Sequence, residues 1–241
     1  MRRLVVTLSL VVLIGAGWTT ARDDDPFTVY AAASLTESFP RIAAGARFQF
    51  GGSNQLALQI RQAAPADVFA SASPLYTQQL YREGLVERPR MFATNSLVLA
   101  VPKRNPAGIR SVYDLAKRPE LKLVVAGAKV PVGLYTREVL KRLELLRVLR
   151  KAVSQEPDVK GIVGKLALGE ADAGFVYATD VRAAAGRLVA IPLPRRSQPT
   201  IRYEVAVVRS TKNRAGAFEL IADLLGADGR RELARAGFGL P

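Results

Sequence analysis

The sequence of 241 residues contains no cysteine and no histidine. Without cysteine, no disulfide can support the fold and no lipid anchor can be attached to a cysteine side chain. Without histidine, the chain lacks the most common general base and the most common transition-metal ligand of proteins. The two absences exclude serine–histidine hydrolysis and histidine-based zinc chemistry.

Long apolar runs are also scarce, and the clearest one lies at the N-terminus, over residues 4–18. It follows two arginines, and the small residues 19–21 and an acidic stretch come after it. The run is too short to span a bilayer comfortably and is typical of a cleaved secretory signal peptide. We expect residues 1–21 to be removed and the mature chain to reach the periplasm; an N-terminal membrane anchor is the alternative.

Acidic residues are outnumbered, with 21 Asp and Glu against 35 Lys and Arg, which gives a formal net charge of +14. Such a balance is common in nucleic-acid-binding proteins. Here the basic residues are scattered along expected helices without interleaved aromatics, as in residues 137–151. We interpret them as solvated helix faces with a general attraction for anions, and expect no nucleic-acid partner.

The stretch 27–39 carries the first informative pattern. Residues 27–30 are typical of a strand, three alanines follow, and Ser34 with Glu37 forms the S-x-x-E pattern of a helix capping box. A strand that runs directly into a helix start presents free backbone N–H groups and a hydroxyl at one point, where an anion is favoured. A purely structural cap is the alternative for Ser34 when this pattern stands alone.

The same arrangement recurs along the chain. Residues 47–50 predict a second strand, Gly51 and Gly52 a turn, and Ser53 the start of another helix. Residues 65–72 predict a third strand, followed by a helix that starts at Ser73-Pro74. Strands that alternate with helices indicate an α/β protein with a parallel, doubly wound sheet, and about 220 mature residues favour two lobes.

Residues 29–36, 51–57 and 64–72 resemble the first three signature blocks of the periplasmic molybdate-binding proteins, the receptors of molybdate ABC transporters. The resemblance implies the type II periplasmic-binding-protein fold, an α/β fold with two lobes, each a mainly parallel sheet flanked by helices. It implies lobe I from residues 22–100 plus 203–241 and lobe II from residues 101–202. A ligand cleft lies between the lobes, and hinge closure is expected around 97–102 and 203–208.

The resemblance also implies five ligand-binding residues, which are Ser34, Ser53, Val132, Val159 and Tyr177. Val132 and Val159 are expected to act through their backbone N–H groups, and Tyr177 through its hydroxyl. Asp158 stands beside Val159, and we interpret it as a helix cap. No catalytic residue, cofactor or free metal cation is expected, and the chain is not expected to be an enzyme.

A site made only of donors suits a tetrahedral dianion, which offers only acceptors. The expected ligand is molybdate or tungstate; sulfate or thiosulfate is the alternative. A ferric ion would require more tyrosines or carboxylates in the cleft. The expected partners are a membrane-embedded ABC permease and its ATPase, with the receptor itself a monomer.

Overall fold

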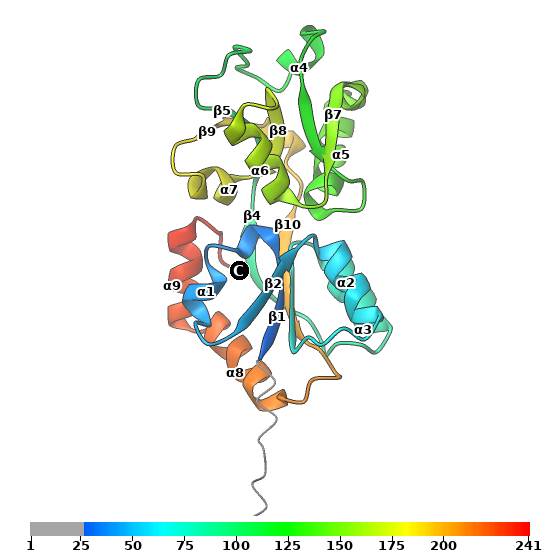
Figure 1. Cartoon of the computed structure of the whole chain (residues 1–241), viewed down its shortest axis with the longest axis vertical. Coiled ribbons are helices and arrows are strands. Elements are labelled where there is room, and N and C mark those ends of the chain that lie inside the picture. Colours follow the sequence, from blue (N-terminus) through cyan, green and yellow to red (C-terminus); the bar gives the residue numbers. More distant parts are fainter. Residues whose placement is uncertain (1–26) are drawn as a thin grey trace, which may run out of the picture.

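The computed structural model describes residues 27–241, so the expected signal peptide, residues 1–21, lies outside the described part of the chain. Two lobes follow one another along the longest axis of the molecule, each built on a five-stranded sheet (Figure 1). Within the described residues, no helix combines the length and the apolar character needed to cross a membrane.

The sheet of lobe I has the strand order β2-β1-β3-β10-β4. Its strands are β1 (Thr28–Ala32), β2 (Arg47–Gly51), β3 (Val68–Ser71), β4 (Arg90–Asn95) and β10 (Ile201–Val207). Strands β2, β1 and β3 pair in parallel, whereas β10 is antiparallel to both β3 and β4. Every residue of β3 is buried, as expected for a strand with helices on both faces.

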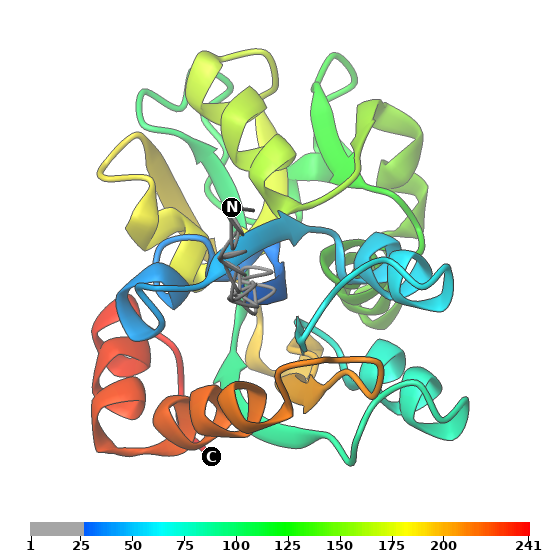
Figure 2. The same cartoon turned by 60° about the horizontal axis from the view of Figure 1, so that its bottom comes forward.

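Helices cover both faces of this sheet, with α2 and α3 on one side and α1, α8 and α9 on the other (Figures 1 and 2). These helices are α1 (Phe39–Ile42), α2 (Ser53–Arg61), α3 (Pro74–Arg82), α8 (Arg214–Leu225) and α9 (Ala227–Ala236). Ser73 caps α3, where its hydroxyl accepts a hydrogen bond from the N–H of Leu75, and Pro74 is the first helical residue. The helix start predicted at Ser73-Pro74 is therefore confirmed.

Lobe II repeats the arrangement of lobe I, with the strand order β7-β6-β8-β5-β9. Its strands are β5 (Leu97–Pro102), β6 (Leu123–Ala126), β7 (Ala152–Glu156), β8 (Ala173–Tyr177) and β9 (Leu188–Pro192). Its α-helices are α4 (Asp114–Lys117), α5 (Pro131–Arg142), α6 (Val159–Leu168) and α7 (Ala178–Ala183). Three 3₁₀-helices complete residues 27–241, η1 (Ala33–Leu35) in lobe I and η2 (Leu146–Lys151) and η3 (Arg195–Ser197) in lobe II.

The two-lobed α/β fold is confirmed, and each sheet is mixed, with a parallel half and an antiparallel half. The chain passes from the first sheet to the second at Ser96, between β4 and β5, and returns through β10. Gln198, shortly before β10, is bonded to Leu97, the first residue of β5. Its side-chain amide accepts a hydrogen bond from the N–H of Leu97 at 3.2 Å and donates one to the carbonyl of Leu97 at 2.7 Å. The expected lobe boundaries, 100/101 and 202/203, fall within β5 and β10 and stay predictions.

One helix start differs from the prediction. The segment that begins at Ser34 forms only the short η1, and the four-residue α1 follows after a turn; neither has a side-chain cap. The Ser34–Glu37 capping box is therefore wrong, because both side chains bond to distant parts of the chain. Helix α5 ends at Arg142, and Glu144 just beyond it adopts a left-handed backbone with φ of 58°.

Candidate binding site

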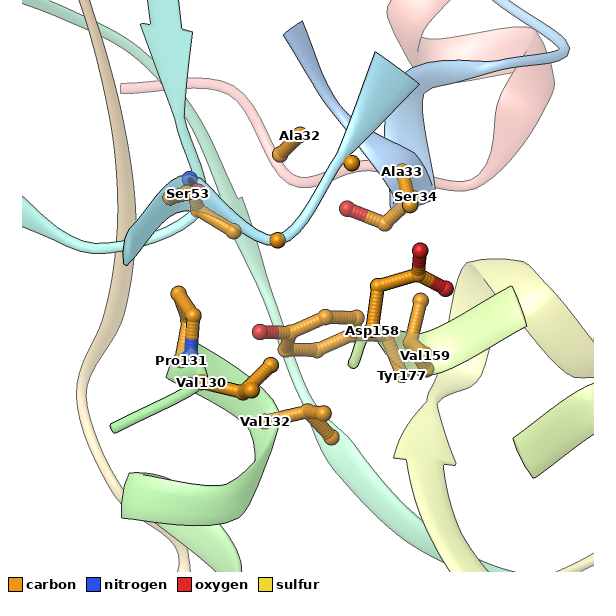
Figure 3. A pocket seen from close by; sticks show the side chains of 13 residues that line it. Ala32, Ala33, Ser34, Ser53, Val130, Pro131, Val132, Asp158, Val159 and Tyr177 are labelled. Atoms are coloured by element: carbon orange, nitrogen blue, oxygen red, sulfur yellow. Dashed lines mark hydrogen bonds between the residues drawn. The ribbon is translucent and has the colours of Figure 1, made fainter. Parts of the chain in front are cut away.

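A small cavity lies between the two lobes (Figure 3). Lobe I lines it with Ala32, Ala33, Ser34, Gly51, Gly52, Ser53 and Ala72, and lobe II with Val130, Pro131, Val132, Asp158, Val159 and Tyr177. The structure thus brings together all five residues that the sequence analysis singled out. The cavity is small, so any guest that it holds must be small as well.

Lobe I contributes the ends of parallel strands and the helical turns that follow them. Ser34 lies in η1, directly after β1, and Ser53 is the first residue of α2, after β2 and the Gly51-Gly52 turn. A side chain cannot replace the hydrogen at Gly52, because a Cβ there would lie 2.5 Å from the carbonyl oxygen of Pro157 in lobe II. The glycine lets the two lobes approach closely at the edge of the cavity.

Lobe II contributes two helix starts. Val132 is the second residue of α5, after Pro131, and Val159 is the first residue of α6. Backbone N–H groups at these positions have no partner within their own helix, and the helix dipole places partial positive charge there. Both helices therefore direct unpaired donors and positive potential toward the same cavity.

Asp158 lines the cavity, but its carboxylate caps the N-terminus of α6. Its Oδ1 accepts hydrogen bonds from the N–H groups of Lys160 at 2.8 Å and Gly161 at 3.2 Å. The interpretation of Asp158 as a helix cap is thus confirmed, and this capping leaves the N–H of Val159 without a bond from that side chain.

The two serine hydroxyls are held by bonds from lobe I. Ser53 Oγ accepts the N–H of Ala72 at 3.1 Å, so its own proton stays available to an acceptor in the cavity. Ser34 Oγ lies 2.9 Å from the hydroxyl of Tyr203. Both serines are almost fully buried, which raises the cost of leaving either hydroxyl without a partner.

Tyr177 ends β8 and is 1 % exposed. Its hydroxyl oxygen is buried without a hydrogen-bond partner among the described residues, and Figure 3 shows it pointing into the space between the lobes. Burial raises the pKa of Tyr177 well above 10, so the group stays a neutral donor across the physiological range. An orphaned buried hydroxyl is uncommon in native proteins and calls for a partner such as an ordered water or a ligand.

Lys160 and two carboxylates form an ion-pair cluster beside the cavity. The ammonium of Lys160 lies 2.8 Å from Glu37 of lobe I and 3.1 Å from the buried Asp180 of lobe II. Burial alone would lower the pKa of Lys160, but Asp180 and Glu37 raise it above its ordinary value. Burial raises the pKa of Asp180 to about 6, against the opposing effect of Lys160.

Two tyrosines add further contacts between the lobes. Tyr135 of lobe II donates to the carbonyl of Ala72 in lobe I at 3.3 Å, and Tyr76 of lobe I donates to the carbonyl of Lys129 in lobe II. Together with the Glu37–Lys160 pair, these bonds hold the lobes around the cavity. The arrangement is that of a closed clamshell.

The sequence analysis missed Tyr203 and Lys160. Tyr203 was included only as the first residue of the expected hinge segment 203–208, and Lys160 was not singled out. Both residues contact side chains far away along the chain, and no local sequence pattern predicts such contacts. Within residues 27–241, no group of three or more acidic, histidine or cysteine side chains is arranged to hold a metal ion.

Comparison with known proteins agrees with this geometry. The sequence pattern of the family described as bacterial extracellular solute-binding protein matches residues 27–239. The chain belongs to this family. This solute-binding protein is also 35 % identical to the molybdate-binding protein ModA of Mycobacterium tuberculosis H37Rv, over 88 % of this chain and 84 % of the relative.

Two further likenesses extend the comparison. The molybdate-binding protein ModA of Haemophilus influenzae is 29 % identical, over 88 % of this solute-binding protein and 89 % of the relative. The solved periplasmic molybdate-binding protein of Azotobacter vinelandii has a TM-score of 0.79 and 23 % identity, over 89 % of this chain and 99 % of that one. The latter likeness supports the two-lobed fold.

Proposed function

We propose that this protein is an exported receptor that binds molybdate, and also tungstate, between its lobes and delivers the ion to an ABC permease. The observation that carries the proposal is the buried Tyr177 hydroxyl, a donor without a partner in the described part of the chain, which faces a cavity lined by helix starts from both lobes. The relatives named for molybdate binding support the choice of ion.

Hydrogen-bond chemistry favours a dianion without protons. The proposed ligand contacts are the hydroxyls of Ser34, Ser53 and Tyr177 and the N–H groups of Val132 and Val159. Every one of these groups can donate, and a fully deprotonated tetrahedral oxyanion offers only acceptors. A monohydrogen phosphate would bring a donor of its own, and a set of contacts that all donate to the ligand would leave that donor unpaired.

The residues that line the cavity favour binding over catalysis. Asp158 and Tyr177 are the titratable side chains among the lining residues, and the first caps a helix while the pKa of the second is raised well above 10. Neither is suited to general acid–base work near neutral pH. The role is therefore to hold an ion, with hinge closure at the crossing strands and release to the permease.

Isothermal titration calorimetry of the mature chain tests the proposal directly. The protein is unfolded, dialysed to remove bound ligand, refolded and titrated with molybdate, tungstate, sulfate, thiosulfate and phosphate. We expect tight binding of molybdate and tungstate and weak or no binding of the others. Tighter binding of sulfate or thiosulfate would assign the site to that ion, and binding of none of them would reject the oxyanion receptor.

A further inference from the structure

Tyr203 lies behind the cavity, outside the set of residues that line it. It belongs to β10, one of the crossing strands, and its side chain is fully buried. Its ring packs against Phe92, Tyr177 and Phe238, with centroid separations of 5.9, 5.9 and 5.4 Å. Its hydroxyl, 2.9 Å from Ser34 Oγ, is a buried polar group attached to a well-packed ring.

The direction of the Tyr203–Ser34 hydrogen bond depends on Asn95, the last residue of β4. Asn95 Oδ1 accepts the N–H of Ser96 at 2.9 Å, which fixes the orientation of the side-chain amide. The amide nitrogen then faces Thr179 Oγ1 at 2.9 Å and the Tyr203 hydroxyl at the longer distance of 3.5 Å. An amide nitrogen only donates, so Tyr203 is the acceptor in its contact with Asn95.

Tyr203 has a single proton, and Ser34 offers the acceptor at 2.9 Å. When Tyr203 donates to Ser34 Oγ, the serine proton is free to point into the cavity. The reverse direction would turn the serine lone pairs toward a bound dianion, which is repulsive. Burial raises the pKa of Tyr203 well above its ordinary value of 10.0, which keeps the required proton in place.

We propose that Tyr203 is a positioning residue, in a relay from Asn95 through Tyr203 to Ser34, that directs the Ser34 hydroxyl toward the bound oxyanion. The inference rests on the proposed function, because the relay has a preferred direction only when an acceptor occupies the cavity. Aligned hydrogen bonds of this kind polarise one another, so the first donor strengthens the last. The relay also joins Ser34 of lobe I to the crossing between the lobes.

Calorimetric titration with molybdate across a double-mutant cycle tests the relay. The variants are Tyr203→Phe, Ser34→Ala and the combination of both, with Tyr30→Phe as the matched control. Tyr30 is a buried tyrosine on β1 outside the cavity lining. Tyr203→Phe keeps the packed ring and removes only the hydroxyl, so its ligand-free thermal midpoint is expected to stay close to that of Tyr30→Phe.

We expect Tyr203→Phe to weaken molybdate binding about tenfold, consistent with the loss of one buried hydrogen bond. In the Ser34→Ala background the same change is expected to have little effect, because the relay then has no serine to orient. Asn95→Ala is expected to weaken binding by a smaller factor, since the contact of Asn95 with Tyr203 is long, at 3.5 Å.

The outcomes distinguish a failure of the relay from a failure of the proposed function. If wild-type protein binds molybdate and Tyr203→Phe binds equally well, the relay is rejected and the proposed function stands. An equal loss from Tyr203→Phe with and without the Ser34 hydroxyl also rejects the relay, because the Tyr203 hydroxyl then acts independently of Ser34. If the wild-type protein binds no oxyanion at all, the proposed function is rejected, and the relay with it.

Discussion

The carboxylate of Glu37 in lobe I accepts two hydrogen bonds from the ammonium of Lys160 in lobe II, each 2.8 Å long. Glu37 stands between η1 and α1, and Lys160 follows Val159 at the start of α6. The pair therefore bridges the two lobes next to a proposed ligand contact. It can form only when the lobes are closed, so it stabilises the closed state over an open one.

Replacing Glu37 with Gln is expected to speed molybdate dissociation and leave its association rate nearly unchanged. A partly exposed ion pair contributes about 0.2–1 kcal/mol, which corresponds to an increase of up to about fivefold in the dissociation rate. Stopped-flow tyrosine fluorescence measures both rates. The matched control is Glu83→Gln, which breaks the 2.7 Å pair with Arg61 inside lobe I. Equal dissociation rates in the two variants would contradict a role of Glu37 in closure.

Removing the serine hydroxyls is expected to weaken oxyanion binding strongly. Ser34→Ala and Ser53→Ala should each cost about 1–3 kcal/mol of binding free energy, because each removes a buried donor to a charged acceptor. Calorimetric titration with molybdate measures the loss. Ser197→Ala is the control, since Ser197 is fully buried in η3 and donates to the carbonyl of Pro194 at 2.7 Å, away from the cavity lining. Unchanged affinity in the double serine variant would remove both serines from the site.

Gly133 lies next to Val132 near the start of α5 and has no room for a methyl group. A Cβ at Gly133 would overlap the carbonyl oxygen of Gly127 and approach that of Ala126 at 2.8 Å. Because both obstacles are backbone atoms, Gly133→Ala must displace the helix start and with it the N–H of Val132. We expect a loss of about 1–3 kcal/mol in the free energy of unfolding, as in overpacked cores, together with weaker molybdate binding.

The control for Gly133→Ala is Gly164→Ala in α6, where a Cβ would meet no atom within 4 Å. This change should stabilise the protein by about 0.5–1 kcal/mol, because alanine loses less conformational entropy than glycine in a helix. Urea unfolding measures both variants. A destabilisation of similar size at the two positions would show that the close approach at Gly133 is not the cause.

The buried Asp180 predicts a particular dependence of stability on pH. Burial raises the pKa of Asp180 from 3.8 to about 6, so between these values the folded state binds more protons than the unfolded state. The contribution of Asp180 to stability is present at low pH and is lost as the pH rises through 6, by up to about 1.4 kcal/mol per pH unit. The pKa of Lys160 is raised, so Lys160 stays charged throughout and adds no slope.

Asp180→Asn provides the comparison. Urea unfolding of both proteins between pH 4 and pH 7 should show the wild type losing stability relative to Asp180→Asn as the pH rises toward 6. Above that pH the difference should become constant. Parallel stability curves over the whole range would mean that the pKa of Asp180 does not differ between the folded and unfolded states.

Much of the site could be predicted because a helix start is encoded by neighbouring residues. Gly52 precedes Ser53, Pro131 precedes Val132, and Asp158 precedes Val159, and each pair fits the first turn of a helix. Parallel strands followed by helices bring such starts to one edge of a sheet. The family resemblance selected these positions as ligand contacts, and the structure places all three at the cavity.

The first serine shows where local reasoning fails. Ser34 and Glu37 match a capping box, yet Ser34 bonds to Tyr203, which is 169 positions away, and Glu37 bonds to Lys160, 123 positions away. Capping the short η1 would stabilise the fold only weakly. Folding instead brings both side chains to stronger partners in distant parts of the chain. Local sequence patterns do not predict which hydroxyl will lie beside Ser34, or which ammonium group beside Glu37, after folding.

By itself, the sequence determined the two-lobed α/β architecture, the helix starts that present N–H and hydroxyl donors, and the absence of histidine and cysteine chemistry. Only the tertiary structure decided how those donors are oriented, through Tyr203 behind Ser34, and what joins the lobes, through Lys160. Helix starts depend on a few adjacent residues, whereas the direction of a hydroxyl and the closure of a cleft depend on contacts that exist only after the whole chain has folded.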